Sequence, residues 1–309
     1  MAMLVNVNEF GIDVAKDWLD IFNGHEVIRI DNNLRSIKSF LKHLSSDSIL
    51  AVESTNTYHE RLVETAIAAG LTVYLIDAYR LSRYREAVGV RAKTDANDAR
   101  LLLRYLRSER SQLIPFKPLP KAIKRLNRLL KARAKLAKYK ASMSLALSGI
   151  PELVQTRKAL QNRFKAATEV IDKRILECII LAGYKADYER CCAIPGIGHV
   201  NAAALVAVYH RGYFSKSDSF IAFMGLDVRV RESGYFKGKR KLTKKGNPEL
   251  RRLLFNAARA GAKTKQWNAY YISMRARGHT TTATAVALSR KIARLAFALM
   301  RDQSEYRPV

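Results

Sequence analysis

The sequence predicts an α/β N-terminal domain, a long helical arm and a mainly helical C-terminal domain. Three features of the 309-residue chain lead to this prediction. Strand patterns and then alternating helix and strand patterns fill the first third, a basic stretch with helical spacing follows, and glycines cluster with basic residues between Gly196 and Gly246. Because this length is long for a single core, we expect two domains, at residues 1–110 and 184–309, joined by a basic helical linker at residues 111–183.

The first third alternates strand and helix patterns. Apolar and polar residues alternate in FGIDV, WLDIF and EVIRI, which predicts two or three short strands between residues 8 and 31. Asp13 then closes the first strand, and Asn23-Gly24 marks a turn. The expected order is β-β-β-α-β-α-β-α, which is the topology of an RNase H-like (RuvC-like) domain. Its later elements are a helix at 34–44, a strand at 49–53, a helix at 58–69, a strand at 71–76 and a helix at 96–106.

Four acidic residues occupy positions where such a domain binds metal. Asp13 and Glu53 end the first and fourth strands, while Asp95 and Asp98 lie three residues apart at a helix start and so share a face. Gathered carboxylates repel one another unless a cation neutralises them, and oxygen ligands favour a hard ion such as Mg²⁺. The sequence therefore predicts metal-assisted phosphodiester chemistry, although any single aspartate is more often a surface residue or helix cap.

The charge balance favours a polyanionic partner. Lys and Arg number 55 against 27 Asp and Glu, which leaves a formal charge of +28. Nucleic acid is the expected partner, with an anionic membrane surface as the alternative. No run of about 18 apolar residues exists and no charged leader precedes an apolar stretch, so we expect a soluble, cytoplasmic protein without a membrane segment. Cys178, Cys191 and Cys192 fit neither a disulfide framework nor a zinc site.

The segment from Lys117 to Lys140 holds ten basic residues and no acid. Its apolar residues keep helical spacing, so it reads as a helix with one apolar stripe and a cationic remainder that binds nucleic acid or is simply solvated. A second long helix follows Pro151, with apolar residues stepping by three or four from Leu160 to Cys178. These two helices either pack on each other within one subunit or form a dimerising coiled coil.

A glycine-rich turn precedes an Ala-rich helix at residues 200–208. The turn, AIPGIG, resembles a helix-hairpin-helix, in which backbone N–H groups of Gly196, Ile197 and Gly198 would hold a phosphate without reading sequence. A plain glycine turn between helices is the alternative.

Ser233 lies in the basic stretch RESGYFKGKRKLTKKGNPELRR. Surrounding cations would hold a phosphate and stabilise developing negative charge, yet a serine beside glycine usually marks a turn, and no base is identifiable nearby. A P-loop is not indicated, because the spacing from Gly234 is one residue short and Arg240 stands where Ser or Thr is required. The expected nucleic-acid contacts here are Lys237, Lys239, Arg240, Lys241, Lys244, Lys245 and Arg251.

The whole chain resembles the insertion-sequence transposases and Piv-type DNA invertases, which combine a RuvC-like DEDD domain with a C-terminal transposase domain. The motifs that carry the resemblance are GIDVAK, ESTNTY, KTDANDAR, IPGIG, FMGLDVRVRESG and KKGNPELRRLL, in that order. Two positions depart from the family pattern: Asn56 replaces a glycine, and Val228 replaces a proline.

The resemblance implies specific roles. Asp13, Glu53, Asp95 and Asp98 would bind Mg²⁺, and Ser233 would be the nucleophile. It also implies recombination of DNA without ATP, in several members guided by a structured bridge RNA, by a homo-oligomer that associates with the prokaryotic nucleoid during the reaction. Since Ser233 and the acids lie in different domains, the resemblance favours assembly between subunits.

Three functions follow from the sequence. The first is a DNA transposase or invertase that exchanges strands through a serine–DNA phosphodiester. The second is a RuvC-like structure-specific nuclease that cuts by water attack, with Ser233 structural. The third is a basic nucleic-acid-binding protein without catalysis.

Overall fold

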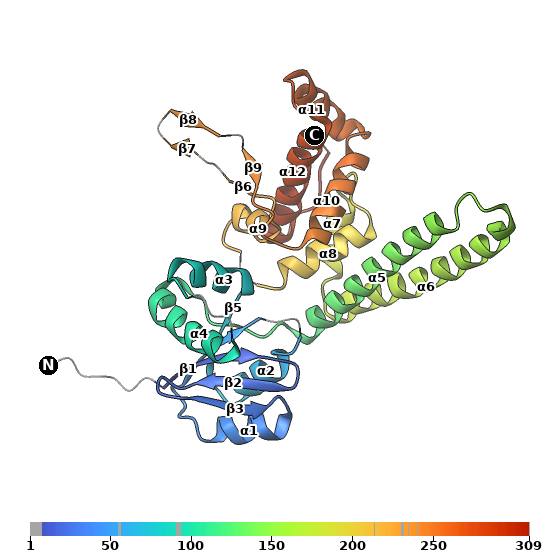
Figure 1. Cartoon of the computed structure of the whole chain (residues 1–309). Coiled ribbons are helices and arrows are strands. Elements are labelled where there is room, and N and C mark those ends of the chain that lie inside the picture. The colour runs from blue at the N-terminus through green and yellow to red at the C-terminus, as the bar shows by residue number, and fades with distance from the viewer. Residues whose placement is uncertain are drawn as a thin grey trace. The chain divides into compact units, whose positions relative to one another are not determined.

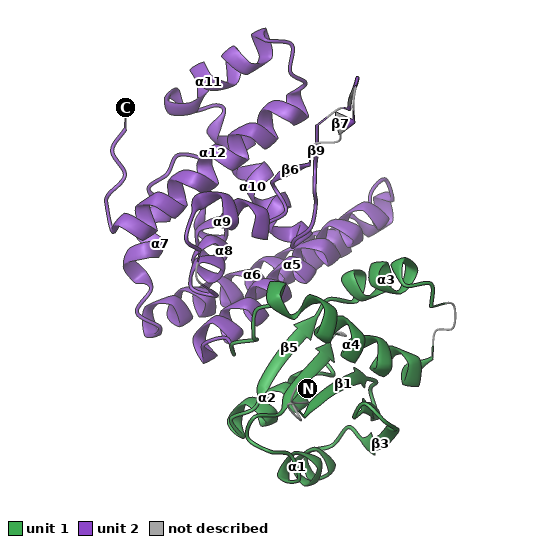
Figure 2. Cartoon of the chain, turned by 90° about the vertical axis from the view of Figure 1, so that its left-hand side faces the viewer, with its two compact units in different colours: residues 1–118 green, residues 119–309 purple. Residues whose placement is uncertain are grey.

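The computed structural model describes residues 8–54, 57–90, 94–212, 214–229, 232–233, 235–238 and 240–308. The chain divides into two compact units, residues 1–118 and residues 119–309, which Figure 2 colours separately. The first unit is an α/β domain and the second is mainly helical.

A five-stranded sheet forms the centre of the first unit, in the order β3-β2-β1-β4-β5 (Figure 1). Strands β1 and β2 pair antiparallel, as do β2 and β3, whereas β1, β4 and β5 run parallel. This confirms the expected RNase H-like α/β arrangement. The strands are β1 (Glu9–Val14), β2 (Trp18–Phe22), β3 (Val27–Asp31), β4 (Ile49–Glu53) and β5 (Thr72–Ile76).

Helices cover both faces of this sheet. Because side chains alternate along a strand, Leu50 and Val52 of β4 pack with α1 and α2, while Ile49 and Ala51 pack with α3 and α4. Helix α3 was not predicted from the sequence. Leu81 is its one buried residue, so the helix has no apolar stripe that a sequence pattern could show. The helices are α1 (Leu34–Lys42), α2 (Glu60–Ala68), α3 (Ala78–Ala87) and α4 (Asp95–Glu109), followed by a 3-10 turn (Arg110–Gln112).

Helix α4 approaches β1 very closely. A Cβ atom on Gly11 would overlap the carbonyl oxygen of Ala99 and would lie 2.7 Å from the backbone nitrogen of Leu103. The helix begins at Asp95, where the Thr94 side chain accepts a hydrogen bond from the N–H of Asn97 at 3.3 Å. Such N-caps fix where a helix starts, so the first turn of α4 is set beside β1.

The second unit starts with two long helices, α5 (Lys121–Ala146) and α6 (Val154–Leu181), joined through a 3-10 turn (Pro151–Leu153). They lie side by side (Figure 1), and the Arg133 guanidinium of α5 pairs with the Asp172 carboxylate of α6 at 2.6 Å. Ile123 and Leu126 of α5 and Ile175 and Ile179 of α6 are buried. The two helices therefore pack on each other within one chain.

Helix α8 and five other helices complete this unit among the described residues, and α8 is buried from Ala202 to Val208. An apolar helix of this kind belongs at the centre of a core. Phe220, Phe297 and Ile292 belong to the same buried cluster as these α8 residues. The helices are α7 (Lys185–Cys192), α8 (His199–Tyr209), α9 (Ser217–Phe223), α10 (Pro248–Gly261), α11 (Lys265–Ala276) and α12 (Thr281–Asp302).

Two pairs of very short strands interrupt the helices between α9 and α10. Strand β6 (Val228–Arg229) pairs with β9 (Lys241–Leu242), and β7 (Glu232–Ser233) pairs with β8 (Phe236–Lys237), both antiparallel. Figure 1 shows them running out from the helices of this unit. The sequence did not indicate these strands, because two residues are too few to produce a periodic pattern.

Candidate catalytic site

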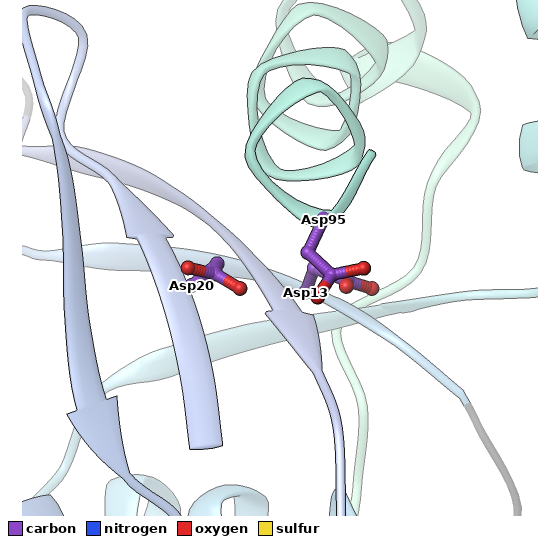
Figure 3. Close-up of side chains that lie close together, drawn as sticks. All are labelled: Asp13, Asp20 and Asp95. Atoms are coloured by element: carbon purple, nitrogen blue, oxygen red, sulfur yellow. The ribbon is translucent and has the colours of Figure 1, made fainter. Parts of the chain in front are cut away.

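Carboxylates from three elements of the first unit converge. Asp13 lies in β1, Asp20 in β2 and Asp95 in the first turn of α4, and carboxylate oxygens of all three lie within 4.8 Å of one another. Figure 3 shows the Asp13 and Asp95 carboxylates next to each other, with Asp20 on the neighbouring strand. Asp13 and Asp20 are directly paired across the antiparallel strands, so they project from the same face of the sheet.

Glu53 and Asp98 join this cluster. Burial, followed by the negative charge of Glu53 at the end of β4 and of Asp98 and Asp95, raises the pKa of Asp13 to about 7. The Asp13 and Glu53 side chains also share a hydrogen bond that stabilises the protonated form. The other three acids expected from the sequence thus lie close enough to raise the pKa of Asp13.

Asp20 and Asp95 share an arginine. The Arg29 guanidinium of β3 binds both oxygens of Asp20, at 2.9 and 2.8 Å, and its Nη2 lies 3.6 Å from Asp95 Oδ2. Trp18 stacks on this guanidinium at 4.8 Å and donates its indole N–H to Asp95 Oδ2 at 3.3 Å. Strands β2 and β3 therefore hold the Asp95 carboxylate in place.

Asp98 has its own arginine. Arg85 of α3 donates to Asp98 Oδ1 at 2.5 Å, and the side chains are only 14% and 8% exposed. A buried carboxylate requires such a partner. The Nε–H of Arg85 is itself buried and has no hydrogen-bond partner among the described residues.

The cluster fits a divalent cation. Its donors are all carboxylate oxygens, which hard cations of the Mg²⁺ type prefer. The two nearby arginines are fewer than the acids around them. Burial makes the largest contribution to the raised pKa of Asp13, and repulsion from Glu53, Asp98 and Asp95 adds to it. A cation with two positive charges would relieve that repulsion.

Ser233 belongs to the other unit, where it is exposed on strand β7 and pairs with Phe236 of β8. Asp227 and Thr243, at the base of the strand pairs, are hydrogen-bonded through their side chains. The side chains expected to bind nucleic acid here are exposed at Arg240, Lys241, Lys244 and Lys245. For Lys237 the structure describes the backbone and not the side chain, and Lys239 lies outside the described residues.

Arg251 at the start of α10 binds the protein's own backbone. Its guanidinium donates to the carbonyl oxygen of Gly246 at 2.8 Å and to that of Met224 at 3.4 Å. A Cβ atom on Gly225 would come within 2.8 Å of this guanidinium. Arg251 thus fastens the end of the basic stretch to the loop that follows α9.

The glycine turn joins α7 to α8. Gly196 has a left-handed φ of 95°, and a Cβ atom on it would lie 2.5 Å from the carbonyl oxygen of Ala257 in α10. Ile197 is buried, and Gly198 is the N-cap of α8. Close packing against α10 therefore explains why residue 196 is a glycine. The N–H groups at the start of α8 lie at a helix N-terminus, which is the end of a helix that favours anions.

Two family models match the chain. A DEDD transposase model of IS110 type matches residues 10–150, and the model described as "Transposase IS116/IS110/IS902 family" matches residues 188–272. The chain belongs to this family of insertion-sequence transposases. The first match covers the strands and helix that carry the acids, and the second covers the glycine turn and Ser233.

Two curated relatives match this transposase over nearly its whole length, and a third matches about half of it. The pilin gene-inverting protein of Moraxella bovis is 24% identical over 314 residues, covering 96% of both chains. A probable family 20 transposase of Pseudomonas aeruginosa is 24% identical over 347 residues, covering 98% of this chain and 100% of the relative. The transposase for insertion sequence element IS1111A of Coxiella burnetii is 29% identical over 170 residues, covering 53% of this chain and 46% of the relative.

Family membership makes the protein a DNA recombinase, an enzyme whose partner is DNA. Domains of the DEDD type typically depend on divalent metal, in agreement with the acidic cluster. Among the described residues, no helix is both long enough and apolar enough to cross a membrane.

Sequence reasoning missed Asp20, Arg29 and Arg85. A signal for Asp20 was present, because a charged residue in the middle of the apolar strand WLDIF needs a partner if that strand is central. Arg85 carried no such signal, since it lies in a helix rich in exposed arginine.

Proposed function

We propose that this transposase uses Asp13, Glu53, Asp95 and Asp98 to bind Mg²⁺ beside a DNA phosphodiester and uses the Ser233 hydroxyl as the nucleophile. The observation that carries the proposal is the gathering of these acids around Asp13, whose pKa their charges help to raise to about 7. Bound there, the metal supplies positive charge that stabilises the attacking and departing oxygens of an in-line displacement.

The residues around the cluster keep these carboxylates in position. Trp18 and Arg29 hold Asp95, and Arg85 occupies Oδ1 of Asp98. Since Arg85 binds only one Asp98 oxygen, the other oxygen stays available as a ligand. Arg29 neutralises Asp20, so Asp20 fixes the arginine and is not assigned as a fifth ligand.

The serine step exchanges one phosphodiester for another. The Ser233 oxygen attacks phosphorus, the bond from phosphorus to the departing deoxyribose oxygen breaks, and the serine proton ends on that oxygen. A deoxyribose hydroxyl of another strand then reverses the step and reseals DNA. This chemistry stores the phosphodiester's energy, whereas attack by water leaves a break. The exposure of Ser233 on a short hairpin supports access to DNA.

Further partners belong to the same proposal. The start of α8 and the exposed cations near Ser233 contact DNA phosphates, and a structured guide RNA selects the sites. Because Ser233 and the acids belong to different units, joint action on one phosphodiester is proposed for an oligomer bound to DNA. The net charge of +28 supports several phosphate contacts.

Trapping a covalent protein–DNA adduct tests the serine. The protein is incubated with Mg²⁺, DNA carrying its element ends and RNA transcribed from the element, and the adduct is digested and sequenced by mass spectrometry. We expect a nucleotide on Ser233, no adduct with Ser233→Ala and a normal adduct with Ser304→Ala, which changes an exposed serine elsewhere. Nicking by Ser233→Ala at the wild-type rate would instead identify a nuclease that uses water.

Asparagine substitutions test the acids. Asp13→Asn and Asp95→Asn should each reduce strand cleavage by several orders of magnitude, whereas Asp47→Asn, an exposed aspartate outside the cluster, should not. If both cluster variants recombine DNA as wild type does, the acids are not catalytic. If neither the wild-type protein nor any variant cleaves or recombines DNA, only the function of a non-catalytic DNA-binding protein remains.

A further inference from the structure

A hollow of about 650 Å³ lies within the second unit, bordered by α5, α8 and the start of α10. The three helices that border the hollow, α5, α8 and α10, can be located in Figure 1 by their labels. Most of its lining is apolar, and we call this apolar part the floor; it includes Leu130 and Ala134 of α5, Ala207 of α8 and Leu253 of α10. Its volume is in the range of sites that enclose organic ligands.

Cations surround this apolar floor. Lys131 and Lys135 of α5 and Arg211 after α8 line the hollow and are exposed, and none has an ion-pair partner among the described residues. Arg211 instead stacks on the half-buried ring of Phe223, at 5.0 Å from its centroid. The hollow therefore combines uncompensated positive charge with apolar and aromatic surface.

Acidic groups do little to offset this charge. Among the described residues that line the hollow, Glu249 is the one carboxylate, and Arg252 binds both of its oxygens, at 2.8 and 2.5 Å. Helix α5 itself contains no acidic residue. An occupant with several negative charges is favoured, and an apolar or cationic one is not.

We infer that this hollow binds a single strand of DNA, with phosphates on Lys131, Lys135 and Arg211 and bases on the apolar floor. A duplex turns its bases inward and offers mainly phosphates to such a surface, whereas a single strand offers both parts. The inference rests on the proposed function, because strand exchange would release single-stranded DNA that the protein has to bind during the reaction.

Binding of a fluorescein-labelled 20-nucleotide oligodeoxythymidine to the full-length protein tests the inference. Anisotropy is measured in EDTA, where no metal-dependent reaction occurs, so failure here and failure of the adduct experiment are separate results. The test variant is Lys131→Glu with Lys135→Glu. The control is Lys138→Glu with Lys140→Glu, which makes the same charge change on exposed residues of the same helix outside the hollow.

We expect the Lys131/Lys135 variant to bind about tenfold more weakly, and the slope of log K against log salt to fall by about 1.4 for two lost phosphate contacts. The control should weaken binding by less than about threefold. Ala134→Trp, which fills the floor without changing charge, should weaken binding as much as the test variant. Circular dichroism would confirm that each variant is folded.

Several results would overturn the inference. Equal losses in the two lysine pairs, together with normal binding by Ala134→Trp, would mean that the charge of α5 attracts DNA without a defined site. Equal competition by polyglutamate would mean that bases make no contribution. Tighter binding of oligouridine, lost in the same variants, would assign the hollow to RNA instead of DNA.

Discussion

Gly11 of β1 lies directly against the main chain of Ala99 in α4, so closely that a single added methyl group would overlap the Ala99 carbonyl. Gly11 and Asp13 project from the same face of the strand, and Ala99 follows Asp98 in the helix. The missing side chain therefore brings the acids of α4 to those of the sheet. The gathering of the proposed metal ligands therefore depends on a glycine that has no side chain.

Gly11→Ala should lower the free energy of unfolding by about 3 kcal/mol, because the methyl group would have to displace helical backbone. Denaturant unfolding measures this loss. Gly212→Ala is the control, since a Cβ atom there meets nothing within 4 Å. Equal stability of the two variants would show that α4 does not need this close approach.

The stability of the metal-free protein should fall as pH rises toward neutrality. The pKa of Asp13 is about 7 in the fold and 3.8 as a free side chain, so the folded protein binds more protons between these values. This contribution is complete below about pH 4 and lost as pH rises through 7. Unfolding is measured from pH 4 to pH 8 in EDTA.

Asp13→Asn removes this titration while keeping the side chain's shape. In EDTA at pH 8 we expect the variant to be more stable than wild type by about 1 to 2 kcal/mol, after discounting the shift for solvent screening. The difference should vanish near pH 4. A variant less stable than wild type at pH 8 would show that burial and repulsion do not destabilise the Asp13 carboxylate.

Arg85→Gln should lower stability by about 3 kcal/mol, since it leaves the buried Asp98 carboxylate without its cation. Arg83→Gln, on the same helix, removes an ion pair with Glu86 whose side chains are 61% and 62% exposed, and should have a much smaller effect because solvent screens this pair. Thermal unfolding of both variants in EDTA measures the contrast. Similar losses would mean that the Arg85–Asp98 pair is no stronger than a surface pair.

Much of the fold could be predicted from the sequence. The alternation in FGIDV, WLDIF and EVIRI and the apolar run before Glu53 predicted the sheet, and strand ends placed Asp13 and Glu53 at one edge of it. Asp20 was missed because its place opposite Asp13 depends on cross-strand register. Arg85 was missed because its helix is mostly exposed and its partner, Asp98, lies 13 positions away in the sequence.

The short strands around Ser233 and the hollow beside α5 also lay beyond sequence reasoning. Two-residue strands have no detectable period. The positive charge of α5 was evident from the sequence. Which of its lysines line the hollow depends on how α5 packs against α8 and α10, and these segments are distant in the sequence. Lys131 and Lys138 are indistinguishable in the sequence and differ only in the fold.

Direct titration of Mn²⁺, followed by the electron paramagnetic resonance signal of the free ion, tests the central claim that the gathered acids bind a divalent cation. The wild-type protein should bind Mn²⁺, Mg²⁺ should compete, and saturation at 100 times Kd should stabilise the fold by about 2.7 kcal/mol. Asp13→Asn with Asp95→Asn should lose this binding while Asp47→Asn retains it. Unchanged Mn²⁺ affinity in the double variant would contradict the account.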